Sequence, residues 1–64
     1  MTQVNKTGHY LCRDGRVAYV NAVGRTHAKG FIYSHYRSWE TWNLLGQVDP
    51  FSPSPRDLIG EHHE

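Results

Sequence analysis

Short runs of apolar, aromatic and β-branched residues recur along this chain between polar, glycine-containing segments, a pattern typical of β-strands joined by turns. The clearest example is residues 10–20, where two β-prone runs flank the dipeptide Asp14-Gly15. A two-residue type I′ turn needs positive φ at both central positions, which Asp and Gly tolerate. We therefore predict a hairpin whose strands span residues 9–13 and 16–23.

The middle of the chain predicts further short elements. Residues 24–30 are polar and bracketed by glycines, which predicts a loop. Residues 31–36 are rich in aromatic and branched side chains and predict a third strand. A fourth strand is predicted at residues 38–43, followed by a turn at 44–46 and a short return strand at 47–48.

Two segments leave alternatives open. Ser38 can cap a helix over residues 38–45, although the strand is the favoured interpretation. The three prolines in residues 49–55 exclude a central strand there, because proline has no amide donor. Residues 54–60 form either one helical turn or a last edge strand.

Together these elements predict a mainly all-β fold, a small antiparallel β-meander or open barrel with room for one short helical turn. We expect a flexible N-terminus at residues 1–8, a single β domain at 9–60 and a mobile tail at 61–64.

The length of the chain favours self-association. A domain of 64 residues buries only roughly 60% of the surface of its unfolded chain, so its stability is marginal. Cys12 is the only cysteine, which excludes an internal disulfide and a zinc site built on paired cysteines. We therefore expect a homo-oligomer. No apolar run reaches the ~20 residues that span a bilayer and no signal peptide is recognisable, so we expect a cytoplasmic protein with no membrane partner.

Charge is sorted along the sequence. Residues 1–37 carry six cations against Asp14 alone, a net +5, and residues 38–64 carry one cation against five carboxylates, a net −4. This asymmetry indicates an anion-binding face on the first half, a self-complementary pair of subunits, or two ordinary solvated surfaces.

Several short motifs resemble those of small phage and prophage accessory proteins of unknown function. The motifs are Tyr10, Arg13-Asp14-Gly15-Arg16, Gly30-Phe31-Ile32, Trp42, Gly46 and Ser54-Pro55-Arg56-Asp57-Leu58-Ile59. The resemblance implies a phage-encoded protein in the host cytoplasm. Such proteins often act against host defence, either by blocking a host protein or by sequestering a nucleotide signal. The resemblance supplies no catalytic residues.

Cations near turns are the first candidate binding groups. Arg13 and Arg16 flank the predicted two-residue turn and would face each other, so they either clamp a phosphate or splay apart in solvent. Arg25 and Lys29 lie on the predicted glycine-bracketed loop, which either surrounds a phosphate or is a plain connection.

A dense aromatic stretch supplies the second group of candidates. Its members are Tyr33, His35, Tyr36, Arg37, Trp39 and Trp42. Tyr, Trp and Arg dominate interface hot spots, and aromatic rings stack on nucleobases. We expect part of this stretch to be a ligand or subunit surface, the alternative being that both tryptophans lie in the core.

The chemistry of the chain favours binding over catalysis. Cys12 lies beside Arg13, which could lower the pKa of its thiol, but no Cys-His-acid order can be recognised. The five histidines show no metal-ligand spacing, so neither a metal nor a cofactor is expected. The favoured function is non-enzymatic sequestration of an anionic, nucleotide-like signalling molecule by a homo-oligomer. The alternatives are an inhibitor that binds a host defence enzyme and a weak nucleic-acid-binding protein.

Overall fold

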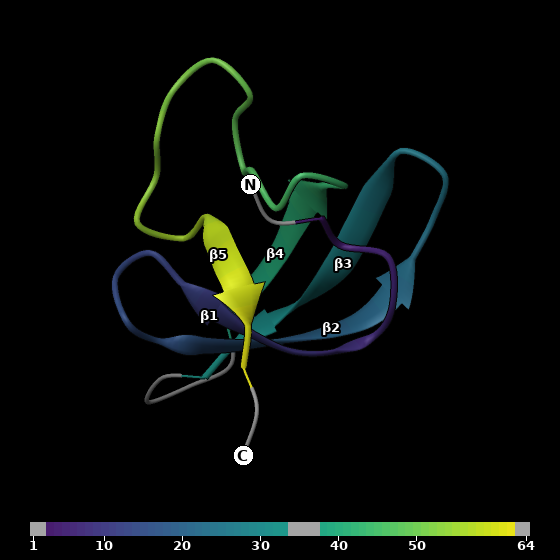
Figure 1. Ribbon diagram of the computed structural model, residues 1–64, viewed down its shortest axis with the longest axis horizontal. Helices are drawn as coiled ribbons and strands as arrows, with labels where there is room; N and C mark the ends of the chain where they lie inside the picture. The colour runs from purple at the N-terminus through teal and green to yellow at the C-terminus, as the bar shows by residue number, and fades with distance from the viewer. Residues whose placement is uncertain (1–2, 34–37, 63–64) are drawn as a thin grey trace.

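The computed structural model describes residues 3–33 and 38–62, and in them the chain forms one open antiparallel sheet (Figure 1). Its five strands are β1 (Gly8–Cys12), β2 (Val17–Val23), β3 (His27–Ile32), β4 (Ser38–Asn43) and β5 (Leu58–Glu61). The strand order is β4-β3-β2-β1-β5, so a four-strand meander is completed by β5, which returns to pair with β1. The predicted all-β meander is confirmed, and no helix occurs in the described residues.

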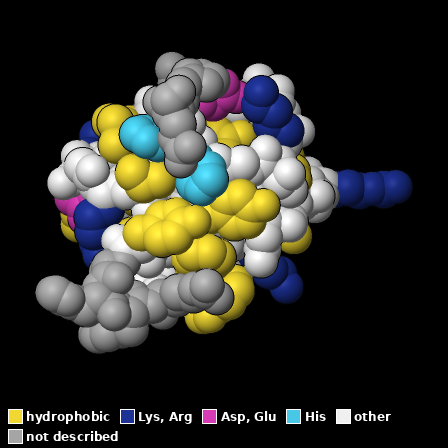
Figure 2. Space-filling view, turned by 90° about the horizontal axis from the view of Figure 1, so that it is seen from below, with side chains coloured by type: hydrophobic (Ala, Val, Ile, Leu, Met, Phe, Trp, Pro, Cys, Tyr) yellow, Lys and Arg dark blue, Asp and Glu magenta, His cyan; other side chains and the backbone are white. Residues whose placement is uncertain are grey.

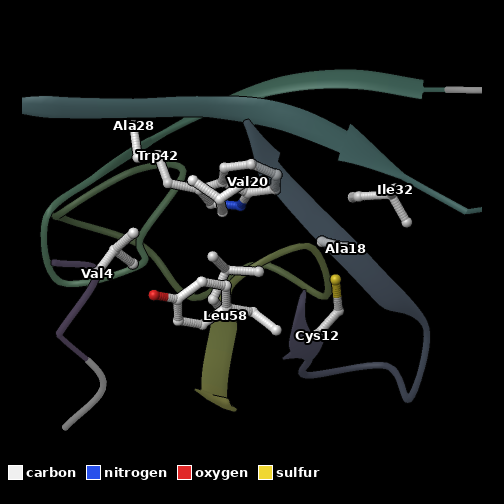
Figure 3. Packing of buried hydrophobic residues seen from close by; sticks show 9 residues of the cluster. Val4, Cys12, Ala18, Val20, Ala28, Ile32, Trp42 and Leu58 are labelled. Carbon is white, nitrogen blue, oxygen red and sulfur yellow. The ribbon is translucent and has the colours of Figure 1, made fainter. Parts of the chain in front are cut away.

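The hydrophobic core lies on one face of the sheet, which we call the inner face (Figure 3). Side chains from every strand contribute to it, and so does Val4 ahead of β1. The core residues are Val4, Tyr10, Cys12, Ala18, Val20, Ala28, Ile32, Trp42 and Leu58. Trp42 is the largest fully buried side chain, and its indole Nε1 donates to the carbonyl oxygen of Arg56 at 2.8 Å.

The β1–β2 hairpin closes through a three-residue turn, which corrects the predicted two-residue turn. Cys12 N donates to Arg16 O at 2.8 Å, and Gly15 N donates to Cys12 O at 3.0 Å. Gly15 has φ +94°, whereas no described non-glycine residue has positive φ. In this three-residue turn only the last residue, Gly15, needs positive φ. A type I′ turn would require positive φ at Asp14 as well. Because residue 16 pairs with Cys12, Arg13 and Arg16 do not face each other.

Strand β3 begins earlier than predicted. It starts at His27 and ends at Ile32, so four of the seven residues in the predicted 24–30 loop are strand, and the connection from β2 is a short hairpin tip. Gly24 N donates to His27 O at 2.8 Å across this tip. Gly30 is buried on the inner face, where a Cβ would collide with the carbonyl oxygen of Tyr19. The glycine therefore marks a close approach of two strands beside a β-bulge in β2, not the end of a loop.

The segment between β4 and β5 is an ordered connection that arches away from the strands (Figure 1). The predicted turn at residues 44–46 is present, but no strand forms at 47–48. The segment is organised by Asp57, a residue that is only 3% exposed. Its carboxylate accepts hydrogen bonds from Val48 N and Ser54 N, each at 3.0 Å, and lies 3.4 Å from the Arg13 guanidinium.

Both ends of the described chain are tied to the sheet. Val4 is buried and its amide donates to Leu44 O at 2.8 Å, so packing begins well inside the predicted flexible N-terminus. Glu61 belongs to β5 and His62 N donates to His9 O at 3.0 Å, so only residues 63–64 of the predicted tail lie outside the described residues. Over residues 3–33 and 38–62 there is no helix that could cross a membrane.

Candidate ligand-binding face

The outer face of the sheet carries a row of aromatic rings. His9 on β1 is paired with Tyr19 on β2, Tyr19 with Phe31 on β3, and Phe31 with Trp39 on β4. Side chains at directly paired positions lie on the same face and touch. We call the set His9, Tyr19, Phe31, Tyr33 and Trp39 the outer aromatic face. Figure 2 views the molecule from below relative to Figure 1 and shows hydrophobic side chains gathered on this face beside histidine.

The rings form a continuous contact network. Ring centroids are 5.1 Å apart for His9–Tyr19, 5.8 Å for Tyr19–Phe31 and 5.3 Å for Phe31–Trp39. Tyr33, just after β3, lies edge-on to Phe31 at 5.2 Å. These edge-to-face and tilted arrangements are the favourable ones for aromatic pairs, so the rings hold one another in place.

Two rings of this network remain open to solvent. Tyr33 is 46% exposed and Trp39 is 61% exposed, whereas Phe31 between them is only 8% exposed. Tyr33 is held from one side by His9, whose ring is stacked at 5.9 Å and whose Nε2 lies 3.3 Å from the phenolic oxygen. The face therefore offers two positioned ring surfaces on a rigid scaffold.

The aromatic candidates divide between the two faces. Trp39 and Trp42 are three residues apart on β4, so they point to opposite sides, and the expectation that Trp42 contributes to a binding surface is wrong because it is fully buried. His35, Tyr36 and Arg37, also predicted as site residues, lie outside the described residues.

His9, Tyr19 and Phe31 lie on the outer aromatic face but were not predicted as site residues. The predicted two-residue turn would pair His9 with Val20 and put His9 and Tyr19 on opposite faces. The two rings share a face because the three-residue turn shifts the register of the hairpin by one residue.

Three of the five described cations in residues 1–37 are paired with carboxylates. Arg16 Nη2 lies 2.6 Å from Asp14 Oδ2, and Arg13 pairs with the buried Asp57. These contacts give both guanidiniums a role in holding the hairpin turn, in place of the predicted phosphate clamp. Lys6 pairs with Glu61, and Arg56 in the second half of the chain pairs with Glu40.

Two cations have no carboxylate partner within residues 3–33 and 38–62, namely Arg25 and Lys29. Lys29 is exposed on β3, on the same face as Phe31 two residues along, and is paired with the exposed Thr41 of β4. Arg25 is exposed at the tip of the β2–β3 hairpin. Lys29 therefore borders the outer aromatic face, with Arg25 beyond it.

The thiol and the histidines form no reactive centre in the described part of the chain. Burial, and then the nearby Asp14 carboxylate, raise the pKa of Cys12 to about 11, so the expectation that Arg13 lowers it is wrong. A buried thiol of raised pKa is a poor nucleophile at neutral pH. No group of three His, Cys, Asp or Glu side chains gathers in these residues as a metal site would require.

A small polar pocket of about 230 Å³ opens at the edge of the sheet beside β5. It lies between the segment leading into β1 and the end of β5, and it is lined by Lys6, Thr7, Gly8, His9, Tyr10, Glu61 and His62. Its one described cation, Lys6, is already paired with Glu61 at 3.3 Å. The pocket is therefore a poorer anion site than the surface beside Lys29.

Comparisons of the chain with family models, with curated proteins and with solved structures find no match. The resemblance to phage accessory proteins therefore stays a prediction.

Proposed function

We propose that this protein binds a nucleotide-like anion without catalysis, through its outer aromatic face. The observation that carries the proposal is that the exposed Trp39 lies diagonally across the β3–β4 pair from Lys29, which has no carboxylate partner among the described residues. A nucleotide needs a π surface for its base and a cation for its phosphate, and both are present on this face.

The spacing of the two groups suits a single nucleotide. Trp39 is paired with Phe31, and Lys29 is two residues from Phe31 along β3. Two residues of strand span about 7 Å, so a base on Trp39 leaves its phosphate within reach of the flexible lysine. Thr41, paired with Lys29, adds a hydroxyl at the same end of the face. Arg25 at the hairpin tip adds attraction at longer range.

In this role the protein holds its ligand rather than transforms it. Sequestering a nucleotide signal, as the resemblance to phage accessory proteins implies, requires only affinity and abundance. The raised pKa of Cys12 and the rigid ring network support binding over catalysis.

Titration calorimetry with AMP tests the proposal. Lys29→Ala and Trp39→Ala should each weaken binding by about 1–3 kcal/mol, the range for losing a charge-assisted hydrogen bond or one stacked base. Lys6→Ala and Phe51→Ala are matched controls, because they remove an exposed lysine and an exposed phenylalanine elsewhere. Equal losses in the controls, or no binding by the parent protein, would refute the proposed site.

We also propose that the chain self-associates. Beyond the outer aromatic face, three large hydrophobic side chains of the described residues are exposed, namely Leu45, Phe51 and Ile59. A domain this small gains stability by burying such groups between subunits. Light scattering at micromolar concentration should give a mass above the 7.4 kDa of one chain, and a stable monomer would contradict this.

A second candidate function, inhibition of a host enzyme by direct docking, is favoured by Phe51. This side chain is 94% exposed on the segment that Asp57 organises, and Phe51 N donates to Asp49 Oδ1 at 2.9 Å. An aromatic anchor on a preorganised loop is typical of protein-docking surfaces. Cross-linking in host cells should capture a partner that Phe51→Ser loses and Ile59→Ser retains. Retention by Phe51→Ser would exclude this candidate.

A further inference from the structure

We propose that the outer aromatic face accommodates two bases joined by a phosphodiester, with the first base on Trp39 and the second on Tyr33. This inference rests on the proposed function, since it extends the same site from one nucleotide to two. The shared chemistry is that of a dinucleotide or a longer single strand.

The exposed rings of Trp39 and Tyr33 are too far apart for one base to stack on both. Tyr33 is two residues beyond Phe31, and Trp39 is paired with Phe31, so the two rings occupy diagonal positions. Diagonal neighbours on antiparallel strands lie roughly 7–8 Å apart. A base stacked on Trp39 therefore does not reach Tyr33, and a neighbouring base can stack on the part of the Tyr33 ring that His9 leaves exposed.

Phe31 keeps the two surfaces apart. Its ring is edge-on to both partners, with interplanar angles of 76° to Tyr33 and 70° to Trp39. At 8% exposure it offers almost no surface of its own. The network thus presents two stacking sites with a spacer between them, rather than one broad platform.

Lys29 sets the direction in which a dinucleotide lies on this face. Lys29 is paired with Thr41, two residues from Trp39 on β4, and it precedes Tyr33 by four residues along the chain. The 5′ phosphate of a ligand therefore binds at Lys29 beside the base on Trp39, and the second base lies on Tyr33.

Binding of AMP, ADP and the 5′-phosphorylated dinucleotide pApA separates these contributions. ADP adds charge without a base, whereas pApA adds a base. The dinucleotide should bind about fivefold to a hundredfold more tightly than AMP, the gain that one stacked base gives, and ADP should gain much less. Tyr33→Ala should lower pApA affinity to that of AMP and leave AMP affinity within about twofold. Trp39→Ala should weaken both ligands.

Three results would overturn the inference. Equal affinity for AMP and pApA refutes the second base site while leaving the proposed function intact, and so does an equal gain for ADP. Failure of both AMP and pApA to bind refutes the proposed function as well. A 5′-phosphorylated A12 strand then identifies the source: many-fold tighter binding than pApA indicates a single strand, and equal binding indicates a free dinucleotide.

Discussion

Trp39 and Trp42 stand three positions apart on β4 and lie on opposite faces of the sheet. Trp39 is 61% exposed beside Phe31, whereas Trp42 is fully buried with its indole nitrogen bonded to the carbonyl of Arg56. A strand alternates its side chains with a period of two, so an odd separation divides the pair between core and surface. Trp42 therefore contributes to stability, whereas Trp39 belongs to the proposed binding face.

Replacing the two tryptophans should therefore have different consequences. Trp42→Ala leaves a large cavity and an unpaired carbonyl, which costs roughly 3–5 kcal/mol and should prevent a domain of this size from folding. Trp39→Ala should change stability by less than about 1 kcal/mol. Thermal melts followed by circular dichroism measure both effects. Similar melting temperatures for the two variants would show that the faces are assigned wrongly.

Gly30 should tolerate no side chain. A Cβ there meets the backbone of Tyr19 and Val20, which belongs to the neighbouring strand and cannot rotate away. Gly30→Ala should cost about 1–3 kcal/mol through overpacking. Gly60→Ala is the matched control, since a Cβ at that strand position meets nothing within 4 Å. Denaturant unfolding of both variants measures the difference, and equal stabilities would contradict the observed close approach of β2 and β3.

Asp57 should hold the β4–β5 connection in place. Asp57→Ala leaves the amides of Val48 and Ser54 without acceptors and frees the Arg13 guanidinium. An unsatisfied buried donor costs about 1–3 kcal/mol, so the variant should be clearly destabilised. Hydrogen exchange should show faster exchange at Val48 and Ser54 than in the parent protein. Asp49→Ala, on the same segment but exposed, serves as the control. Unchanged protection at Val48 in Asp57→Ala would contradict this role.

Stability should fall in alkaline solution. Burial raises the pKa of Cys12 from its ordinary value near 9.0 to about 11, and burial also raises the pKa of Tyr10. A group whose pKa is raised by folding contributes stability that is complete below the unfolded pKa and is lost as pH rises through the folded pKa. The loss from Cys12 should thus fall between about pH 9 and 11.

Removing the thiol tests that assignment. Cys12→Ala should make the alkaline decline in unfolding free energy shallower, while Tyr10 keeps part of it. An unchanged slope between pH 9 and 11 would show that the Cys12 thiol does not titrate with folding.

The sequence predicted the strands well. It predicted the structural roles of the glycines less well. The all-β class, the first hairpin and the fourth strand follow from the β-prone runs and from Asp14-Gly15. The predicted third strand begins four residues late because glycines such as Gly24 and Gly30 are typical of loop boundaries. Gly30 is instead in the strand because two backbones approach there, a tertiary requirement that no local pattern reveals.

The predicted site residues are divided by the fold. Lys29, Tyr33 and Trp39 lie on the outer face, whereas Trp42 lies in the core. The roles of Arg13 and Arg16 differ because their partners, Asp57 and Asp14, depend on a long-range fold and on the true turn length. The net charges of residues 1–37 and 38–64 could not show which cations are paired with carboxylates in the fold.

The central claim, that the outer aromatic face binds a nucleotide, is tested most directly by the two indole N–H signals in a ¹H–¹⁵N spectrum. During titration with AMP the Trp39 indole signal should shift progressively, together with the amides of Lys29 and Tyr33. The Trp42 indole, buried and bonded to Arg56 O at 2.8 Å, should stay in place as an internal reference. Shifts confined to the edge pocket around Thr7 and Gly8, with the Trp39 indole unmoved, would contradict the account.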